Sequence, residues 1–147
     1  MKRTILFSLV IIIAALVTVG CCDCRKRSKY EKPLVGTTWQ LVQIMAKDVA
    51  PEGDSYTILF RDNGIASGKG DCNVFTTTYR MTTSRLLEIG ELGTTRRYTP
   101  HHEAEAAYFD MLEGVTHYEM DADHMLLLSN GTLVGIMKAV GEAADER

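Results

Sequence analysis

Alternation of apolar and polar residues limits most of this 147-residue chain to folds built mainly from β-strands. In the run TTWQLVQI, Trp39 and Leu41 fall on one face of an extended strand. In the run SYTILF, Tyr56, Ile58 and Phe60 occupy alternate positions in the same way. Side chains on one face of a β-strand recur every second residue, so each run predicts a strand with one buried face.

Turn-forming residues separate these runs at short intervals. An Asp-Asn-Gly triplet occupies 62–64, and Asn130-Gly131 stands between HMLLLS and TLVGIMKAV. Because Asn and Gly tolerate positive φ, both places predict hairpins. We expect the strand after the first hairpin to be interrupted at Gly68 and Gly70, and SRLLEIGEL and THYEM to supply further strands. Short strands with turns at this spacing indicate an antiparallel sandwich or barrel.

One segment, TPHHEAEAAYFDMLEGV, has the periodicity of a helix. Thr99 is the expected N-cap, Pro100 the first helical residue and Gly114 a residue near the end. The positions that follow the helical repeat are Ala104, Ala107, Tyr108, Met111, Leu112 and Val115. We therefore expect a mainly β (α+β) fold, a roughly eight-stranded, antiparallel, barrel-like sheet with one α-helix at about residues 100–114.

The first 20 residues have the parts of a secretory signal peptide. Lys2 and Arg3 lie near the start, 15 uncharged residues occupy 5–19, and the small residue Gly20 follows. A helix of that length spans about 22 Å, less than the roughly 30 Å hydrocarbon core of a bilayer. A permanent transmembrane anchor is therefore the weaker alternative.

The sequence Thr18-Val19-Gly20-Cys21 resembles a bacterial lipobox, although Thr18 stands where a Leu-like residue is more usual. In a lipobox the thiol is acylated before cleavage and becomes the new N-terminus, so the resemblance implies a lipid on Cys21. Cys22 does not fit, because Cys21 would then occupy the position that needs a small residue. Five basic residues between 25 and 32 oppose export under the positive-inside rule, and an uncleaved anchor stays open as the alternative.

The polar stretch DCRKRSKYEK has no apolar period and predicts a tether. We divide the chain into a signal peptide (1–20), a lipidated N-terminus with its tether (21–32), a folded domain (33–140) and a C-terminal tail (141–147).

The cysteines do not form a recognisable metal site or a complete set of disulfides. Cys21, Cys22 and Cys24 lack the ligand spacing of a structural zinc site. If Cys21 is acylated, Cys22, Cys24 and Cys72 are an odd number, so at least one thiol is unpaired or bridges between molecules.

Charge limits the partners. When Lys2 and Arg3 are removed with the signal, the 16 basic residues become 14 against 19 acidic ones, a net charge of −5. Phosphate neutralisation needs a basic face, so no nucleic acid is expected as a partner. We expect an exported monomer that its lipid holds at a membrane of the cell envelope, with the outer membrane favoured. Its partner would be an envelope protein or a small ligand.

Five segments carry a family resemblance, GTTWQLVQI, YTILFRDNGIASGKGDCNVFTTTY, LLEIGELGTTRRYTP, EAEAAYFDML and HMLLLSNGTLVGIM. They are similar to the META domain of the heat-inducible, HslJ-like bacterial lipoproteins, and they span Leu34 to Lys138, 105 of 147 residues. The resemblance implies a closed or nearly closed antiparallel barrel with a single helix. It implies no reaction common to the family.

Two of the family's most specific segments are altered here. The Gly-Cys-Asn segment is Asp71-Cys72-Asn73, and the Thr segment with Met-x-Cys is TRRYT at 95–99, without Met or Cys. Because Thr99 stands where the resemblance places the partner of Cys72, any family disulfide between these positions cannot form.

Candidate reactive groups are few. The GIASGKG run at 64–70 lacks the spacing and the hydroxyl residue of a phosphate loop. Cys72 could be a nucleophile with a histidine, but a small structural cysteine is the stronger interpretation. A metal site is a weaker interpretation of the histidines than a solvated helix end. Adjacent histidines at the start of a helix point in different directions and cannot easily bind one ion. The ligands considered are His101, His102, His117 and His124, with Glu103 and Glu105.

The function expected from the sequence is a lipid-anchored cell-envelope domain with a non-catalytic binding role or a stress-related structural role. Cys21 is the one site residue, as the lipidation site. We expect no catalytic residue, cofactor or metal. The alternative is a small enzyme that uses Cys72 or a histidine-containing site. Trp39, Tyr56 and Phe60 could line a ligand cavity, but small barrels more often fill their interiors with such side chains.

Overall fold

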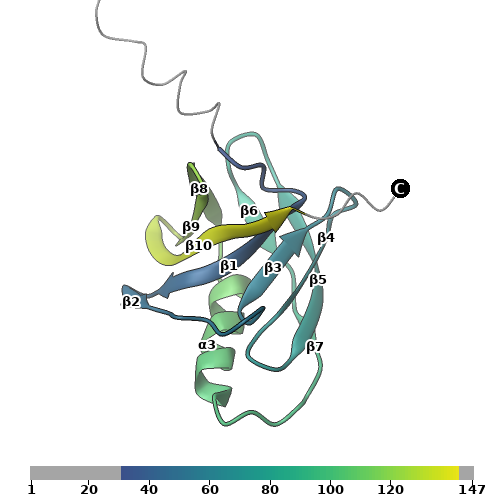
Figure 1. Cartoon of the computed structure of the whole chain (residues 1–147). Helices are drawn as coiled ribbons and strands as arrows, with labels where there is room; N and C mark the ends of the chain where they lie inside the picture. Colours follow the sequence, from purple (N-terminus) through teal and green to yellow (C-terminus); the bar gives the residue numbers. More distant parts are fainter. Residues whose placement is uncertain (1–30, 143–147) are drawn as a thin grey trace, which may run out of the picture. The chain divides into compact units, whose positions relative to one another are not determined.

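The strands form one antiparallel sheet that curls into a barrel (Figure 1). The structure is a computed structural model that describes residues 31–142. The sheet order is β6-β5-β4-β3-β1-β10-β9-β8, while β2 pairs with β1 and β7 pairs with β5. The elements are β1 (Thr37–Ile44), β2 (Lys47–Asp48), β3 (Thr57–Phe60), β4 (Ile65–Lys69), β5 (Val74–Met81), β6 (Leu87–Ile89), β7 (Gly93–Thr94), α3 (His102–Glu113), β8 (His117–Asp121), β9 (His124–Ser129) and β10 (Thr132–Glu142).

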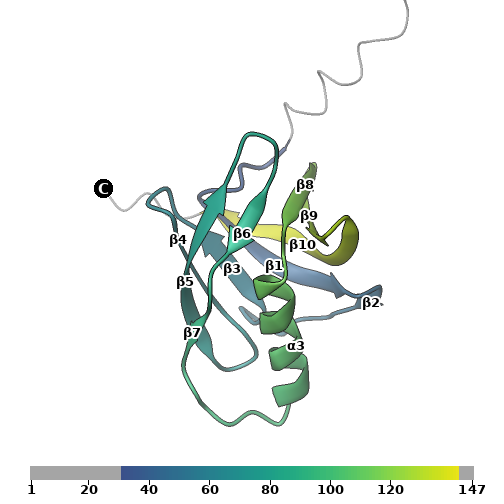
Figure 2. The same ribbon diagram turned by 180° about the vertical axis from the view of Figure 1, so that it is seen from behind.

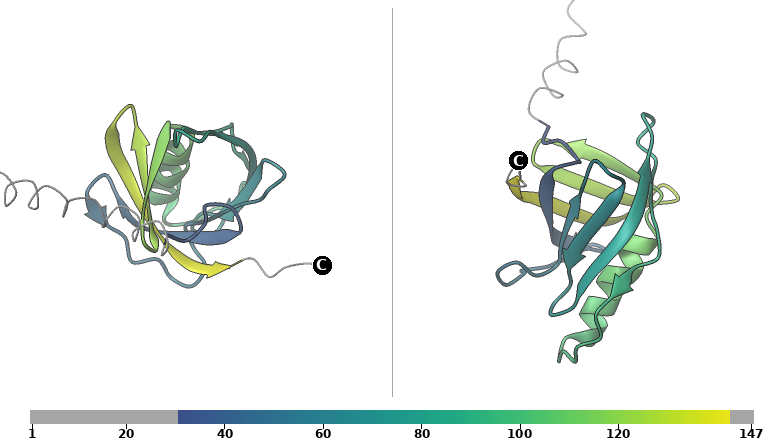
Figure 3. Two further views of the ribbon diagram at one scale, coloured as in Figure 1. Left: turned by 90° about the horizontal axis from the view of Figure 1, so that it is seen from above. Right: turned by 90° about the vertical axis from the view of Figure 1, so that its right-hand side faces the viewer.

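The two outer strands, β6 and β8, meet and close most of the ring (Figure 3). The backbone N–H of Leu87 donates to the carbonyl of Thr116 at 3.0 Å, and that of Tyr118 donates to the carbonyl of Arg85 at 3.0 Å. An isolated bridge between Leu86 and His117 lies between them. The expected roughly eight-stranded, nearly closed antiparallel barrel with one helix is therefore confirmed for the described residues.

The core fills the inside of the barrel with the alternating residues of the strands. Trp39 is fully buried, and its indole N–H donates to the carbonyl of Leu34 at 3.1 Å. This confirms the core interpretation of Trp39. The largest buried side chains are Trp39, Tyr108, Phe60, Leu41, Ile58, Leu87, Leu112, Met125, Leu127 and Met137.

Helix α3 lies toward the end of the barrel opposite to the one at which residues 31–36 enter (Figures 1 and 2). Its buried residues are Glu105, Tyr108, Met111 and Leu112. Ala104 and Ala107, which the helical repeat placed on the same face, are exposed. A carboxylate takes the buried position because loop donors satisfy it, as described below.

The predicted start of the helix was wrong by two residues. His101 is the N-cap and the helix begins at His102, so Thr99 and Pro100 precede it. The Thr99 hydroxyl still supports the first turn, because it accepts a hydrogen bond from the backbone N–H of His101 at 3.0 Å. The same hydroxyl donates to the Asp71 carboxylate, which holds Thr99 outside the helix.

Both predicted hairpins are confirmed. Asn130 and Gly131 have φ values of 49° and 83°, the signs that a two-residue hairpin turn requires. The Asn63 side chain accepts from the N–H of Ile65 at 3.1 Å in the other turn. The expected break at Gly68 was wrong, since β4 runs to Lys69. A Cβ at Gly68 would lie 1.9 Å from the Thr57 carbonyl oxygen, so close strand packing explains this glycine.

The ends of the domain differ slightly from the expected limits. Strand β10 continues to Glu142, two residues beyond the expected end at 140. Within residues 31–142, no helix has the length and apolar character needed to cross a bilayer. The predicted signal peptide, the lipobox, Cys21 and nearly all of the tether lie outside the described residues.

Candidate functional site

A buried carboxylate on α3 organises the loop that carries the altered family motif. Glu105 is only 5% exposed. Its Oε1 accepts from the backbone N–H groups of Cys72 at 3.0 Å and Asn73 at 2.9 Å. Its Oε2 accepts from the Asn73 side-chain amide at 2.6 Å. Because a buried charge is tolerated only when it is well hydrogen-bonded, these donors explain how the helix carries Glu105 inward.

Asn73 extends this network to the segment before α3. Its amide nitrogen also donates to the carbonyl of Arg97 at 3.0 Å. Its amide oxygen accepts from the Thr95 hydroxyl at 2.9 Å and from the backbone N–H of Arg97 at 2.7 Å. Both protons of the amide nitrogen and both lone pairs of the oxygen are thus used. We call this network of Glu105, Asn73, Thr95, Cys72 and Arg97 the Glu105 clamp.

Gly70 allows the close approach on which the Glu105 clamp depends. A Cβ at this position would lie 2.6 Å from Glu105 Oε1 and 2.8 Å from the ring of Phe109. The Gly70 carbonyl accepts from the N–H of Tyr56 at 3.0 Å, which ties the loop to the barrel. Burial raises the pKa of the Tyr56 phenol, and the carboxylates of Asp71 and Glu105 raise it further.

Cys72 joins the Glu105 clamp through its backbone N–H, and its side chain is a free, half-buried thiol. Its sulfur lies 3.7 Å from the carbonyl oxygen of Tyr98 and 3.9 Å from that of Arg97. The Asn73 amide nitrogen is 3.7 Å away on another side. The sulfur is thus surrounded by backbone and side-chain groups of the same loop and of the segment before α3, as expected for a structural cysteine.

The histidines that the sequence offered as ligands are dispersed. His101 and His102 are exposed at the start of α3, which confirms the solvated helix end. His117 Nδ1 lies 3.0 Å from the Thr116 hydroxyl, and His124 Nδ1 lies 2.8 Å from Asp123 Oδ1. In the part of the chain that the structure describes, no three His, Cys, Asp or Glu side chains are grouped to hold a metal ion.

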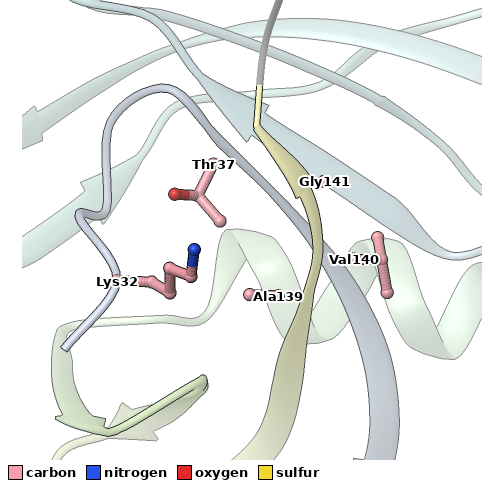
Figure 4. A pocket seen from close by; sticks show the side chains of 5 residues that line it. All are labelled: Lys32, Thr37, Ala139, Val140 and Gly141. Carbon is pink, nitrogen blue, oxygen red and sulfur yellow. The ribbon is translucent and has the colours of Figure 1, made fainter. Parts of the chain in front are cut away.

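A hollow lies at the end of the barrel where the chain enters (Figure 4). It measures about 320 Å³, and we call it the entry hollow. Lys32 comes from the entering segment and Thr37 from the start of β1, while the opposite wall belongs to the end of β10. Its lining residues are Lys32, Thr37, Ala139, Val140 and Gly141.

A second hollow, of about 400 Å³, lies at the hairpin between β5 and β6. Its two charged residues, Arg80 and Glu88, pair with each other at 2.5 Å. The entry hollow differs because Thr37 places a hydroxyl there that has no hydrogen-bond partner among residues 31–142. Sequence reasoning missed this hollow, since nothing in the strand alternation marks it.

Residues 31–142 have the architecture of a small antiparallel barrel with eight ring strands and one helix. A family model, the META domain, matches residues 32–140, and the chain belongs to this family. The resemblance stated from the sequence is confirmed.

Solved structures agree with this assignment. An NMR structure of a protein from Burkholderia xenovorans is 25% identical, with a TM-score of 0.56 over 74% of this chain and 85% of that one. A crystal structure of a duf4847 family protein from Bacteroides vulgatus ATCC 8482 is 16% identical, with a TM-score of 0.58 over 76% of this chain and 96% of that one. At this lower identity the likeness shows the fold alone. No curated protein matches the chain.

Proposed function

We propose that the protein is an exported, lipid-anchored domain of the cell envelope whose barrel binds a partner or small ligand without catalysing a reaction. The observation that carries the anchor is the small residue Gly20 and then Cys21, directly after 15 uncharged residues. Membership of the META domain family is compatible with this role.

The internal hydrogen bonding of the Glu105 clamp supports a binding or structural role over catalysis. Asn73 uses its full hydrogen-bonding capacity within the clamp, and Glu105 accepts from three donors of the neighbouring loop. General acid–base chemistry needs a group that can reach a substrate proton. These groups are instead committed to holding loop, helix and barrel together.

The test of the anchor is the variant Cys21→Ala, compared with Cys22→Ala and Cys24→Ala as matched controls. We expect Cys21→Ala to lose the acyl groups by intact mass and to leave the membrane fraction, while both controls stay acylated and membrane-bound. An unmodified wild-type chain that starts at Met1 would refute the anchor.

The alternative, a small enzyme, is favoured by one observation, the free and half-buried thiol of Cys72. It predicts that the full chain hydrolyses a member of a broad ester and peptide substrate panel, and that Cys72→Ser abolishes the activity. Our proposal predicts no turnover by either protein. Turnover that depends on Cys72 would replace it with the enzyme alternative.

A further inference from the structure

We propose that residues 95–99, which follow β7, bind an acidic segment of a partner protein. Arg96 and Arg97 pair with carboxylates of that segment, and Tyr98 packs against an apolar side chain of it. We call residues 95–99 the Arg-Arg-Tyr loop. This inference rests on the binding role proposed above, because it names the class of partner.

The two arginines of this loop have no partner within residues 31–142. Both are exposed, and neither guanidinium group makes a hydrogen bond or an ion pair there. The other three arginines of the described residues are all engaged, Arg61 with Ser67 at 2.6 Å, Arg80 with Glu88 at 2.5 Å and Arg85 with Glu31 at 3.4 Å. No acidic residue occurs between Glu91 and Glu103, although the chain has a net charge of −3. The loop is therefore a local positive region on an acidic protein.

Tyr98 adds an aromatic ring beside these charges. It is 88% exposed, more than any other large hydrophobic side chain in residues 31–142. Tyrosine and arginine are the residue types, with tryptophan, that contribute most to binding at protein interfaces. An exposed tyrosine next to two unpaired arginines has the composition of the centre of such an interface.

The Glu105 clamp holds the backbone of the loop in place. The N–H of Arg97 donates to the amide oxygen of Asn73 at 2.7 Å, and the Arg97 carbonyl accepts from the Asn73 amide nitrogen at 3.0 Å. On one side the Thr95 hydroxyl donates to the same Asn73 oxygen at 2.9 Å. On the other side the Thr99 hydroxyl donates to the Asp71 carboxylate. A backbone fixed in this way loses less conformational entropy on binding, so the clamp pre-organises the loop for a partner.

The position of the loop favours a protein partner over a membrane. It lies in the connection from β7 to α3, at the end of the domain opposite to the one at which residues 31–36 enter (Figures 1 and 2). The proposed lipid precedes residue 31, so the loop is remote from the point where the tether joins the domain.

The side chains of the loop define the chemistry of the partner. A guanidinium group binds a carboxylate through two parallel, charge-assisted hydrogen bonds. Two adjacent arginines therefore suit a segment with several carboxylates, while a basic segment would meet a like charge. The ring of Tyr98 offers an apolar face, which suits an aromatic side chain among those carboxylates.

The test is a titration of the full chain, purified in a non-ionic detergent, with the blocked peptide Glu-Glu-Glu-Phe-Glu-Glu-Glu. NMR of the backbone amides separates the loop from the basic residues between 25 and 32. We expect saturable shifts at 96–98 that weaken as salt is added, and none with the peptide in which Lys replaces Glu. The proposal is overturned if no saturable shift occurs at 96–98, or if the shifts are confined to 25–32.

Two other anions test the class of partner. An oligothymidylate of equal charge should shift 96–98 less than the acidic peptide, and an equal response would reduce the loop to a general anion site. Phosphatidylglycerol added to the detergent micelles should leave 96–98 unchanged. A shift at these residues with the lipid alone would replace the protein partner with a membrane.

Variants at exposed positions separate binding from folding. The double variant Arg96→Gln, Arg97→Gln should weaken binding of the acidic peptide about tenfold or more, and Tyr98→Ser about threefold or more. Arg80→Gln is the matched control, because Arg80 is an exposed arginine that already pairs with Glu88. It should leave the affinity unchanged. Unchanged affinity in the double variant, or an equal loss in the control, would refute the site.

Thr95→Val tests the pre-organisation of the loop. It removes the hydroxyl that bonds to Asn73 while it keeps the side-chain shape and every charge. We expect weaker binding of the acidic peptide, and an unchanged affinity would show that the clamp does not position the loop for binding.

Failure of this site is distinguishable from failure of the proposed function. The first abolishes the peptide response at 96–98 while Cys21 acylation persists. The second appears as a chain without acyl groups or as turnover that depends on Cys72, and neither result alters the titration.

Discussion

Replacing Glu105 by Gln tests whether the Glu105 clamp stabilises the fold. A glutamine side chain has one oxygen where glutamate has two. If its NH₂ group replaces Oε2, it faces the Asn73 amide nitrogen, which lies 2.6 Å from that position, donor against donor. If it replaces Oε1, the backbone N–H groups of Cys72 and Asn73 lose their acceptor. The first arrangement breaks fewer hydrogen bonds.

The expected loss follows from that arrangement. One hydrogen bond to a charged acceptor is worth about 1.5–3 kcal/mol, and the other two weaken because the acceptor becomes neutral. We expect Glu105→Gln to lower the free energy of unfolding by about 2–4 kcal/mol, a large part of the roughly 5–15 kcal/mol of a typical domain.

Urea unfolding followed by the fluorescence of Trp39, the one tryptophan in the chain, measures this change. Glu103→Gln is the matched control, because Glu103 is an exposed acidic residue in the same first turn of α3. It should change stability by less than about 0.5 kcal/mol. If the two variants unfold at the same urea concentration with the same slope, the argument that the clamp stabilises the barrel is wrong.

Three other measurements check the fold. Trp39→Ala should lower the unfolding free energy by about 3–5 kcal/mol, and the parent should show blue-shifted emission shielded from acrylamide; red, readily quenched emission from the folded parent would contradict this. Burial raises the pKa of the Tyr108 phenol well above 10.0, so stability should fall as the pH rises above that value and the unfolded chain alone ionises. Tyr108→Phe should reduce this alkaline loss, and the part that remains comes from Tyr56 and Tyr79, whose pKa values burial also raises. The variant should not destabilise at neutral pH because the Tyr108 hydroxyl is unpaired. Cys72 is free, so a reductant should leave the unfolding midpoint of the domain unchanged, whereas loss of a native disulfide typically costs about 2–5 kcal/mol.

The elements with local signals could be predicted from the sequence. Alternation placed Trp39, Leu41, Ile58 and Phe60 inside, because burial on one face of a strand has a period of two. The turn at Asn130 and Gly131 also has a local signal, because few residue types adopt the positive φ that the turn requires.

The features that depend on distant partners could not be predicted in this way. An acidic residue in the first turn of a helix suits the helix dipole, but the hydrogen-bond partners of Glu105 come from the loop at Cys72 and Asn73. The Thr99 hydroxyl donates a hydrogen bond to the Asp71 carboxylate. Thr99 therefore lies before the helix, although threonine is a favourable N-cap residue, and His101 occupies the N-cap. The one available signal was the family motif around Cys72. It indicated that the loop is important but did not indicate that Glu105 is its partner.

The entry hollow had no signal at all. The hollow lies beside the extra residue Val140 in β10. A bulge shifts the register between two strands, but it changes the alternation within each strand too little to be recognised in the sequence. The unpaired hydroxyl of Thr37 becomes visible only when the surrounding atoms are placed.

The pairing of β1 with β10 governs when the barrel can assemble. These strands come from opposite ends of the domain, since Thr37 pairs with Glu142 and Ile44 with Gly135. Bringing such distant segments together carries a large loop-closure entropy, so pairing of this kind forms slowly. A chain synthesised from its N-terminus therefore holds the strand of Trp39 with an unpaired edge until the final strand is released. Loss of the last strand would leave that edge open to aggregation. If the chain is exported as proposed, the same delay would keep it unfolded during its passage across a membrane.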